Sequence, residues 1–204
     1  MSAVGFYLEV VRALDELNAP YMLVGAFAGL SFGVRRTTFD VDILVDLQEP
    51  DFDALAQRFP SPRYYADPVQ MRESTRLGIM FNIIDSSEGV KADLAPLPRQ
   101  SNFRVSFERR IRRIFRDEVG HEFQAWCARP EDIIIGKLMA WAEGESAKHP
   151  ADIFDMLIFV GSGSSDVEFD PDIVTTRAAA LGGRVPELWR ELQKRAHEEI
   201  DKRV

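Results

Sequence analysis

Cysteine, histidine and long apolar runs are all scarce in this chain of 204 residues. Cys127 is the only cysteine, so no internal disulfide can form, which is typical of cytoplasmic proteins. The three histidines show no metal-ligand spacing and give no support to a zinc site. No apolar run approaches the roughly 18 residues of a membrane span, and residues 1–10 do not resemble a secretory signal. We therefore expect a cytoplasmic protein with no membrane partner.

Positive charge is also scarce, because 25 basic residues stand against 33 acidic ones and give a net charge of −8. This balance argues against a general nucleic-acid coat. Residues 99–116 are a local exception, with seven arginines and one acidic residue. Two interpretations stay open for this arginine strip: a surface that follows phosphate groups, or a solvated face.

The most informative stretch is residues 21–46, where two apolar runs enclose a segment of small residues. The first run predicts a strand over 21–24. Gly25 then allows a sharp turn. Residues 26–32 predict a short helix, whose N-terminal amide groups would attract phosphate.

The second apolar run, 39–45, alternates apolar and acidic residues and predicts another strand. Asp40 and Asp42 would then share one face, roughly 6–7 Å apart, because strand side chains alternate between faces. Two carboxylates this close repel each other unless a proton or a cation such as Mg²⁺ lies between them. The alternative is a pair of acids that protects an exposed edge strand from aggregation.

A predicted hairpin, with strands over 78–84 and 90–94, offers a third acid. Lys91 and Asp93 share a face of its second strand. A two-metal site needs three or more carboxylates, and Asp93 is the candidate for the third. Asp85 competes with it, but lies in a turn, where acids are favoured for local hydrogen bonds.

The rest of the chain is mainly helical by its apolar periodicity. Residues 102–127 allow either a hairpin around Gly120 or a helix through 107–115, and residues 60–67 read as a loop. Helices are predicted over residues 4–18, from 50 to 59, and over 130–143, 150–160, 170–181 and 185–202.

Two motifs carry a resemblance to a known family. Gly25-Ala26, thirteen residues, then Asp40-Val41-Asp42 resembles the signature of the nucleotidyltransferase (polymerase-beta-like) fold: a glycine turn, a short helix, and Asp-x-Asp on the next strand. Residues 130–137 followed by 150–155 resemble the C-terminal region of AbiEii-type nucleotidyltransferase toxins. The resemblance implies an α+β fold, with a mixed β-sheet flanked by helices over residues 1–127 and a C-terminal helical region over 128–204.

The same resemblance implies an enzyme that moves a nucleotidyl group from an NTP to a hydroxyl of a tRNA 3′ end or of a protein. It would act as the toxin of a toxin–antitoxin pair, with an antitoxin as partner. Two Mg²⁺ ions would be held by Asp40, Asp42 and Asp93. Lys137 would hold the triphosphate, and Asp152 would orient it or assist deprotonation. The expected nucleotide-binding residues are Gly25, Ala26, Arg35, Arg36, Lys91 and Lys137.

Two positions depart from the family pattern. The family usually has Ser, Thr or Gly where this chain has Ala26, and often an arginine where it has Ala151. Both changes remove a phosphate contact, so a nucleotidyltransferase-like module that has lost its chemistry and acts through a protein partner is the alternative to an enzyme. A purely structural ion pair between Lys137 and Asp152 also stays open, because a lysine in an apolar helix face needs an anion.

Overall fold

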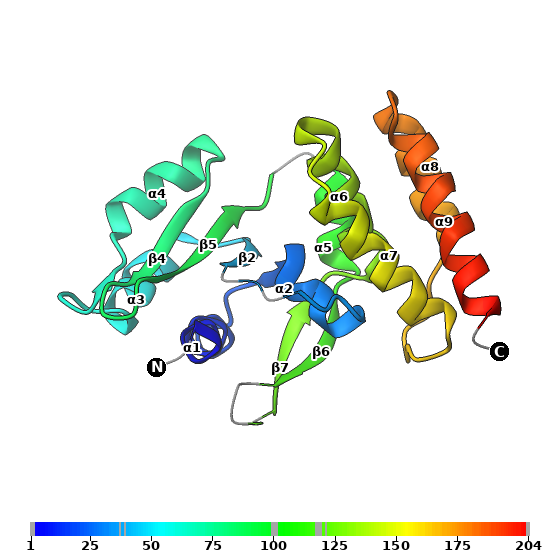
Figure 1. Cartoon of the computed structure of the whole chain (residues 1–204). Coiled ribbons are helices and arrows are strands. Elements are labelled where there is room, and N and C mark those ends of the chain that lie inside the picture. The colour runs from blue at the N-terminus through cyan, green and yellow to red at the C-terminus, as the bar shows by residue number, and fades with distance from the viewer. Residues whose placement is uncertain are drawn as a thin grey trace. The chain divides into compact units, whose positions relative to one another are not determined.

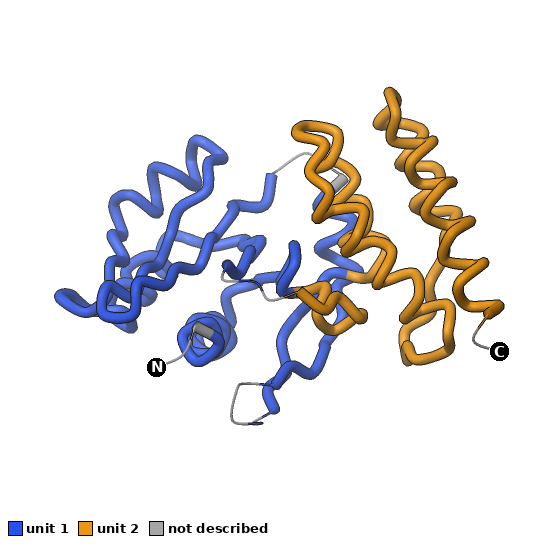
Figure 2. The backbone as a smooth tube through the Cα atoms, viewed as in Figure 1, with its two compact units in different colours: residues 1–27, 38–128 blue, residues 28–37, 129–204 orange. Residues whose placement is uncertain are grey.

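The chain divides into two units, which Figure 2 shows in different colours. The first comprises residues 1–27 and 38–128, and the second comprises residues 28–37 and 129–204. The sequence places residues 28–37 in the first domain, whereas this segment groups with the C-terminal helices. The computed structural model describes residues 3–36, 38, 40–98, 102–116, 120 and 122–202.

A mixed sheet forms the core of the first unit (Figure 1). Its order in the described residues is β3-β4-β5-β2-β1-β7-β6. Strand β2 pairs antiparallel with β1 and parallel with β5, so it lies inside the sheet. The interpretation of its acids as edge protection is therefore wrong. The strands are β1 (Tyr21–Val24), β2 (Asp40–Val45), β3 (Tyr64–Tyr65), β4 (Phe81–Asp85), β5 (Val90–Pro96), β6 (Ile111–Arg116) and β7 (Glu122–Cys127).

The alternation predicted for the acidic strand is present in β2. Val41, Ile43 and Val45 are buried, while Asp40 is exposed and Asp42 is half-buried. Burying three β-branched side chains on one face fixes the register of the strand, because a slip of one residue would put the acids into the core. The apolar face of β2 thus determines where the two carboxylates lie.

Helices of the first unit pack on the sheet and on one another. Helix α1 contacts β5 and α3, α3 contacts α4, and α4 contacts β4 and β5. Helix α3 begins next to the predicted residue 50, with a proline in its first turn, and the structure adds a reciprocal cap between Gln48 and Asp51. The helical segments up to residue 108 are α1 (Ala3–Glu16), α2 (Gly25–Gly29), the 3₁₀ helix η1 (Leu30–Phe32, in the second unit), α3 (Glu49–Arg58), α4 (Pro68–Leu77) and α5 (Asn102–Glu108).

The second unit is helical in its described part. Helix α6 contacts α7, α8 and α9, and α9 also contacts α7 and α8, around a core that includes Ile134, Leu138, Ile153 and Trp189. Each of the four helices begins within about two residues of its predicted start. Their bounds are α6 (Pro130–Gly144), α7 (Lys148–Gly161), α8 (Pro171–Leu181) and α9 (Val185–Asp201). No helix in the described residues has the length and apolar character needed to cross a membrane.

Two local predictions need correction. Residues 60–67 contain the short strand β3, which pairs with the end of β4. Residues 102–127 form α5 and then the β6–β7 hairpin, so the alternative of a helix through 107–115 is wrong. The hairpin is favoured over a helix because Phe115 and Phe123 stack across it, with ring centroids 5.6 Å apart. His121 lies outside the described residues.

Candidate functional site

The parallel pairing of β2 and β5 brings the predicted acids together in the first unit. Asp42 lies directly opposite Asp93, and Asp40 lies opposite Lys91. Residues paired in register point to the same face of a sheet. Four charged groups therefore occupy one polar surface, which we call the acidic cluster: Asp40, Asp42, Asp93 and Lys91.

Gly25 lies against this cluster for a steric reason. Its φ is +68°, and a Cβ atom added there would lie 2.2 Å from Oδ2 of Asp42. The turn that follows β1 thus needs glycine at residue 25 for two reasons: the positive φ, and the space that the carboxylate fills. Ala26, the next residue, is half-buried at the start of the five-residue helix α2.

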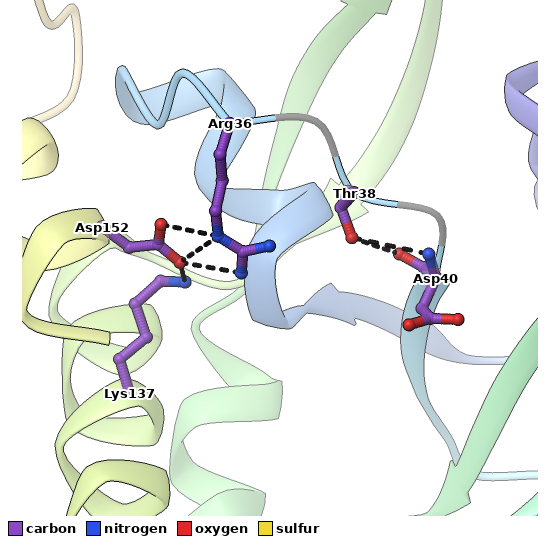
Figure 3. A network of polar contacts seen from close by, with 5 residues as sticks. All are labelled: Arg36, Thr38, Asp40, Lys137 and Asp152. Carbon is purple, nitrogen blue, oxygen red and sulfur yellow. Dashed lines mark hydrogen bonds and ion pairs between the residues drawn. The ribbon is translucent and has the colours of Figure 1, made fainter. Parts of the chain in front are cut away.

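The start of β2 is fixed by a hydrogen bond within the first unit. The hydroxyl of Thr38 donates to the backbone carbonyl of Asp40 at 3.1 Å, as Figure 3 shows. This contact orders the backbone where Asp40 enters the strand.

Asp93 is held by two donors. The Lys91 ammonium donates to both of its carboxylate oxygens, at 2.9 and 2.8 Å, and the side-chain amide of Asn82 donates to Oδ1. Asn82 lies opposite Asp93 in the β4–β5 ladder. The hydrogen bond to Asp93 raises the pKa of Lys91 against the effect of its partial burial, and the charges of Asp40 and Asp42 raise it further. All three carboxylates therefore raise the pKa of Lys91.

Tyr7 is a second side chain whose pKa responds to the three acids, and the sequence places it only on the buried face of a helix. Its pKa is raised to about 12, first by burial and then by the charges of Asp40, Asp93 and Asp42. Helix spacing alone gives no signal for this proximity, which depends on α1 packing against β5.

The acidic cluster has three carboxylates on adjacent strands, and carboxylate oxygens are the hard ligands that Mg²⁺ prefers. The carboxylate of Asp42 occupies the space that a Cβ at residue 25 would fill. Across the described residues, however, no group of three or more His, Cys, Asp or Glu side chains has the spacing of a metal site. Asp93 is engaged by Lys91 and Asn82 instead.

Asp85, the competing acid, has a structural role. Its carboxylate is fully buried and accepts hydrogen bonds from the Arg63 guanidinium, at 2.8 and 3.2 Å, and from the backbone and hydroxyl of Ser87. Burial raises its pKa, but these donors outweigh that effect and lower it to about 2. Asp85 therefore holds the β4–β5 turn closed.

A second charged cluster lies within the second unit (Figure 3). The Lys137 ammonium on α6 is 2.6 Å from Oδ2 of Asp152 on α7, and both side chains are buried. Arg36 adds a two-pronged contact: its Nε is 2.9 Å from Oδ1 and its Nη2 is 3.0 Å from Oδ2. Burial opposes the ionisation of Asp152, but Arg36 and Lys137 hold its pKa below the usual range.

The guanidinium next to Asp152 comes from the segment 28–37 and not from the preceding residue, which is Ala151. Arg35 is exposed, and no ion pair of it is among those described here. Burial and then the charges of Lys148 and Lys137 lower the pKa of His149.

Most of the described arginine strip is engaged in contacts within the first unit. These contacts favour the interpretation as a structured surface over a free phosphate-binding strip, because the charges are already compensated or stacked. The pairs are Arg104 with Asp46, Arg112 with Asp15, Arg116 with Glu122, and Arg110 stacked on Phe107 and Trp126.

Several solved structures align with most of this chain at low identity. JHP933 from Helicobacter pylori aligns over 98% of this chain and 93% of its own, with a TM-score of 0.44 and 16% identity. The antibiotic-resistance factor ANT(2'')-Ia aligns over 98% of this chain and 95% of its own, with a TM-score of 0.43 and 15% identity. An antigenic nucleotidyltransferase-like protein from Paracoccidioides brasiliensis aligns over 90% and 88%, with a TM-score of 0.48 and 18% identity.

No protein-family model matches the sequence, and no curated protein matches it. The similarities of structure are distant, so the function has to be argued from the side chains of this chain.

Proposed function

We propose that the protein is a Mg²⁺-dependent nucleotidyltransferase that transfers a nucleotidyl group from an NTP to an acceptor hydroxyl. The observation that carries the proposal is the register of β2 and β5, which sets Asp42 opposite Asp93 with Asp40 on the same face. The same three charges also add to the raised pKa of Tyr7, after the larger effect of its burial. Three acids on one face repel one another, and this repulsion lowers the stability of the fold unless a cation neutralises part of their charge.

In this proposal Asp40, Asp42 and Asp93 hold the metal, and Gly25 keeps the carboxylate of Asp42 oriented. Bound Mg²⁺ would neutralise charge on the phosphates and lower the pKa of the attacking hydroxyl. The acceptor oxygen bonds to the α-phosphorus, the bond from that phosphorus to the bridging oxygen breaks, and pyrophosphate leaves. The hydroxyl proton passes to solvent.

The roles in the second unit follow from the resemblance and from charge. By the resemblance, Lys137 would hold the triphosphate, and its positive charge suits a phosphate group. Asp152 orients Lys137 and Arg36, as their short contacts with its carboxylate support. The acceptor implied by the resemblance is a tRNA 3′ end or a protein hydroxyl, with a toxin role and an antitoxin partner.

The test is incubation of the protein with each labelled NTP, Mg²⁺, and either total RNA or total protein. Transfer of label should be lost in Asp42→Asn and kept in Asp46→Asn, a matched change just beyond the same strand, where the native residue pairs with Arg104. Equal transfer by the two variants would contradict the proposal. Lys137→Met should also reduce transfer, and a fold check by circular dichroism separates that loss from unfolding.

A second candidate is a binding module without chemistry that acts through a protein partner. Two observations favour it: Ala26 offers no hydroxyl, and Asp93 is engaged by Lys91. This candidate predicts no label transfer and no Mg²⁺-dependent NTP binding, so a titration of NTP with and without Mg²⁺ distinguishes the two.

A further inference from the structure

We infer that the exposed face of helix α4, with the turn after it, is a contact surface for a second copy of this chain in a two-fold symmetric dimer. Helix α4 packs on α3, β4 and β5 within the first unit, and its other side is exposed. The inference does not depend on the nucleotidyl transfer proposed above. We call this exposed region the α4 surface, and its residues are Val69, Glu73, Arg76, Leu77, Ile79 and Met80.

Large apolar side chains gather on the α4 surface. Among the described residues, four of the six large apolar side chains that are more than half exposed lie here. Leu77, Ile79 and Met80 are 60%, 54% and 53% exposed. Val69 is 61% exposed and shares a helix face with Leu77, eight residues later. Single exposed apolar residues are ordinary, but a group of them on one helix face and its turn is typical of a protein–protein contact.

The turn after α4 orders Ile79 and Met80 without covering them. Gly78 has a φ of +69°, and the backbone N–H groups of Gly78 and Ile79 donate to the carbonyls of Thr75 and Ser74, at 3.2 and 3.0 Å. In this type of helix end, an apolar residue at the position of Ile79 usually packs on the residue at the position of Ser74. That residue is a polar serine here, and Ile79 stays exposed. Because the turn is already ordered, little entropy is lost when another molecule covers it.

The charges of the α4 surface favour a second copy of the chain as the partner. Glu73 and Arg76 have opposite charges and are both exposed, and neither forms an ion pair with another described residue. If two α4 helices pack antiparallel about a two-fold axis between residues 74 and 75, Glu73 of each copy faces Arg76 of the other. The same arrangement brings the start of one surface, at Val69, against the end of the other, at Met80. The α4 surface is therefore complementary to itself in both charge and apolar character.

A nucleic acid fits the α4 surface less well. The other arginine of α4 is Arg72, whose guanidinium is engaged by Glu49 and Asp53. Arg76 beside a glutamate gives little attraction for a phosphate backbone, which is bound by several cations. A contact built from one short helix and a turn is small, so we expect a weak dimer whose population depends on concentration.

The test is sedimentation equilibrium of the full chain over a series of concentrations, without nucleotide or metal. The average mass of the wild type should rise from 23.1 kDa toward twice that value as the concentration increases. Leu77→Ser should weaken the dimer about a hundredfold, because each of the two copies loses an apolar side chain that the contact buries. Val105→Ser is the matched control: Val105 is 62% exposed on α5, and its loss should leave the dimer unchanged.

Charge reversal tests the two-fold geometry. Glu73→Arg and Arg76→Glu should each weaken self-association about tenfold, because each change sets like charges against each other in both symmetry-related pairs. An equimolar mixture of the two variants should dimerise again, since opposite charges then face each other in both pairs. The double variant with both changes should dimerise like the wild type. Reversing the exposed pair of Lys194 and Glu198 on α9 should have no effect.

Three results would overturn the inference. A wild type that stays at 23.1 kDa at every concentration leaves the α4 surface to a different protein. A dimer that Leu77→Ser and both charge reversals leave intact places the contact elsewhere on the chain. A dimer that both reversals weaken, and that their mixture does not restore, rules out the two-fold pairing of Glu73 with Arg76.

Discussion

Gly25→Ala is the substitution for which the structure gives the sharpest expectation. The new methyl group would lie 2.2 Å from Oδ2, 3.1 Å from Cγ and 3.3 Å from Cβ of Asp42. Turning the carboxylate relieves only the first of these contacts, so β2 or the turn must also shift. The new alanine would also have to keep a φ of +68°, which residues other than glycine rarely adopt.

The two costs can be given separate magnitudes. Placing alanine in the left-handed region costs about 1–2 kcal/mol. Forcing extra carbon into a packed position costs about 1–3 kcal/mol more, nearer the lower end if the Asp42 side chain turns. Gly25→Ala should therefore lower the free energy of unfolding by about 2–5 kcal/mol.

Gly89→Ala is the matched control, because Gly89 has a nearly equal φ of +67° and nothing within 4 Å of an added Cβ. It carries the strain without the overlap and lies in the same unit. Urea unfolding of both variants measures the difference, which we expect to be about 1–3 kcal/mol. In an Asp42→Ala background the difference should shrink, because Oδ2 and Cγ are then missing.

Equal losses of stability in the two glycine variants would refute the reasoning, since the overlap with Asp42 would then have no energetic consequence. A difference that persists in the Asp42→Ala background would locate the clash elsewhere in the turn. Either result would also remove the argument that Gly25 orients a metal ligand.

Further predictions concern the buried charges. Asp152→Ala should lower the free energy of unfolding by about 3–5 kcal/mol, because it removes the carboxylate that the buried Lys137 ammonium contacts. Thermal unfolding should show that combining Asp152→Leu with Lys137→Met restores part of the lost stability. Arg36→Met should cost clearly less, because Arg36 is 37% exposed. Asp85→Asn should lower the free energy of unfolding by up to about 2 kcal/mol at pH 7, because at that pH the native carboxylate is ionised and binds Arg63. Because the folded pKa is about 2 and the ordinary value is 3.8, this deficit should shrink as the pH falls from 4 toward 2; a constant deficit in urea unfolding would contradict it.

Local patterns were sufficient for the elements that bear the acids. Alternation along residues 40–45 predicts which side chains of β2 face the core, and the turn at residues 86–89 predicts the β4–β5 hairpin. These features depend on neighbours in sequence. The mixed β-sheet with a C-terminal helical region, which the resemblance implies, is confirmed by the structure.

Long-range packing decided what the sequence could not predict. That Asp42 faces Asp93 depends on β2 and β5 pairing in parallel across the intervening helices, strands and loops. That Tyr7 senses the acids depends on where α1 lies on β5. That Arg36 supplies the guanidinium at Asp152 depends on a short segment joining the C-terminal helices. None of these contacts leaves a periodic signal.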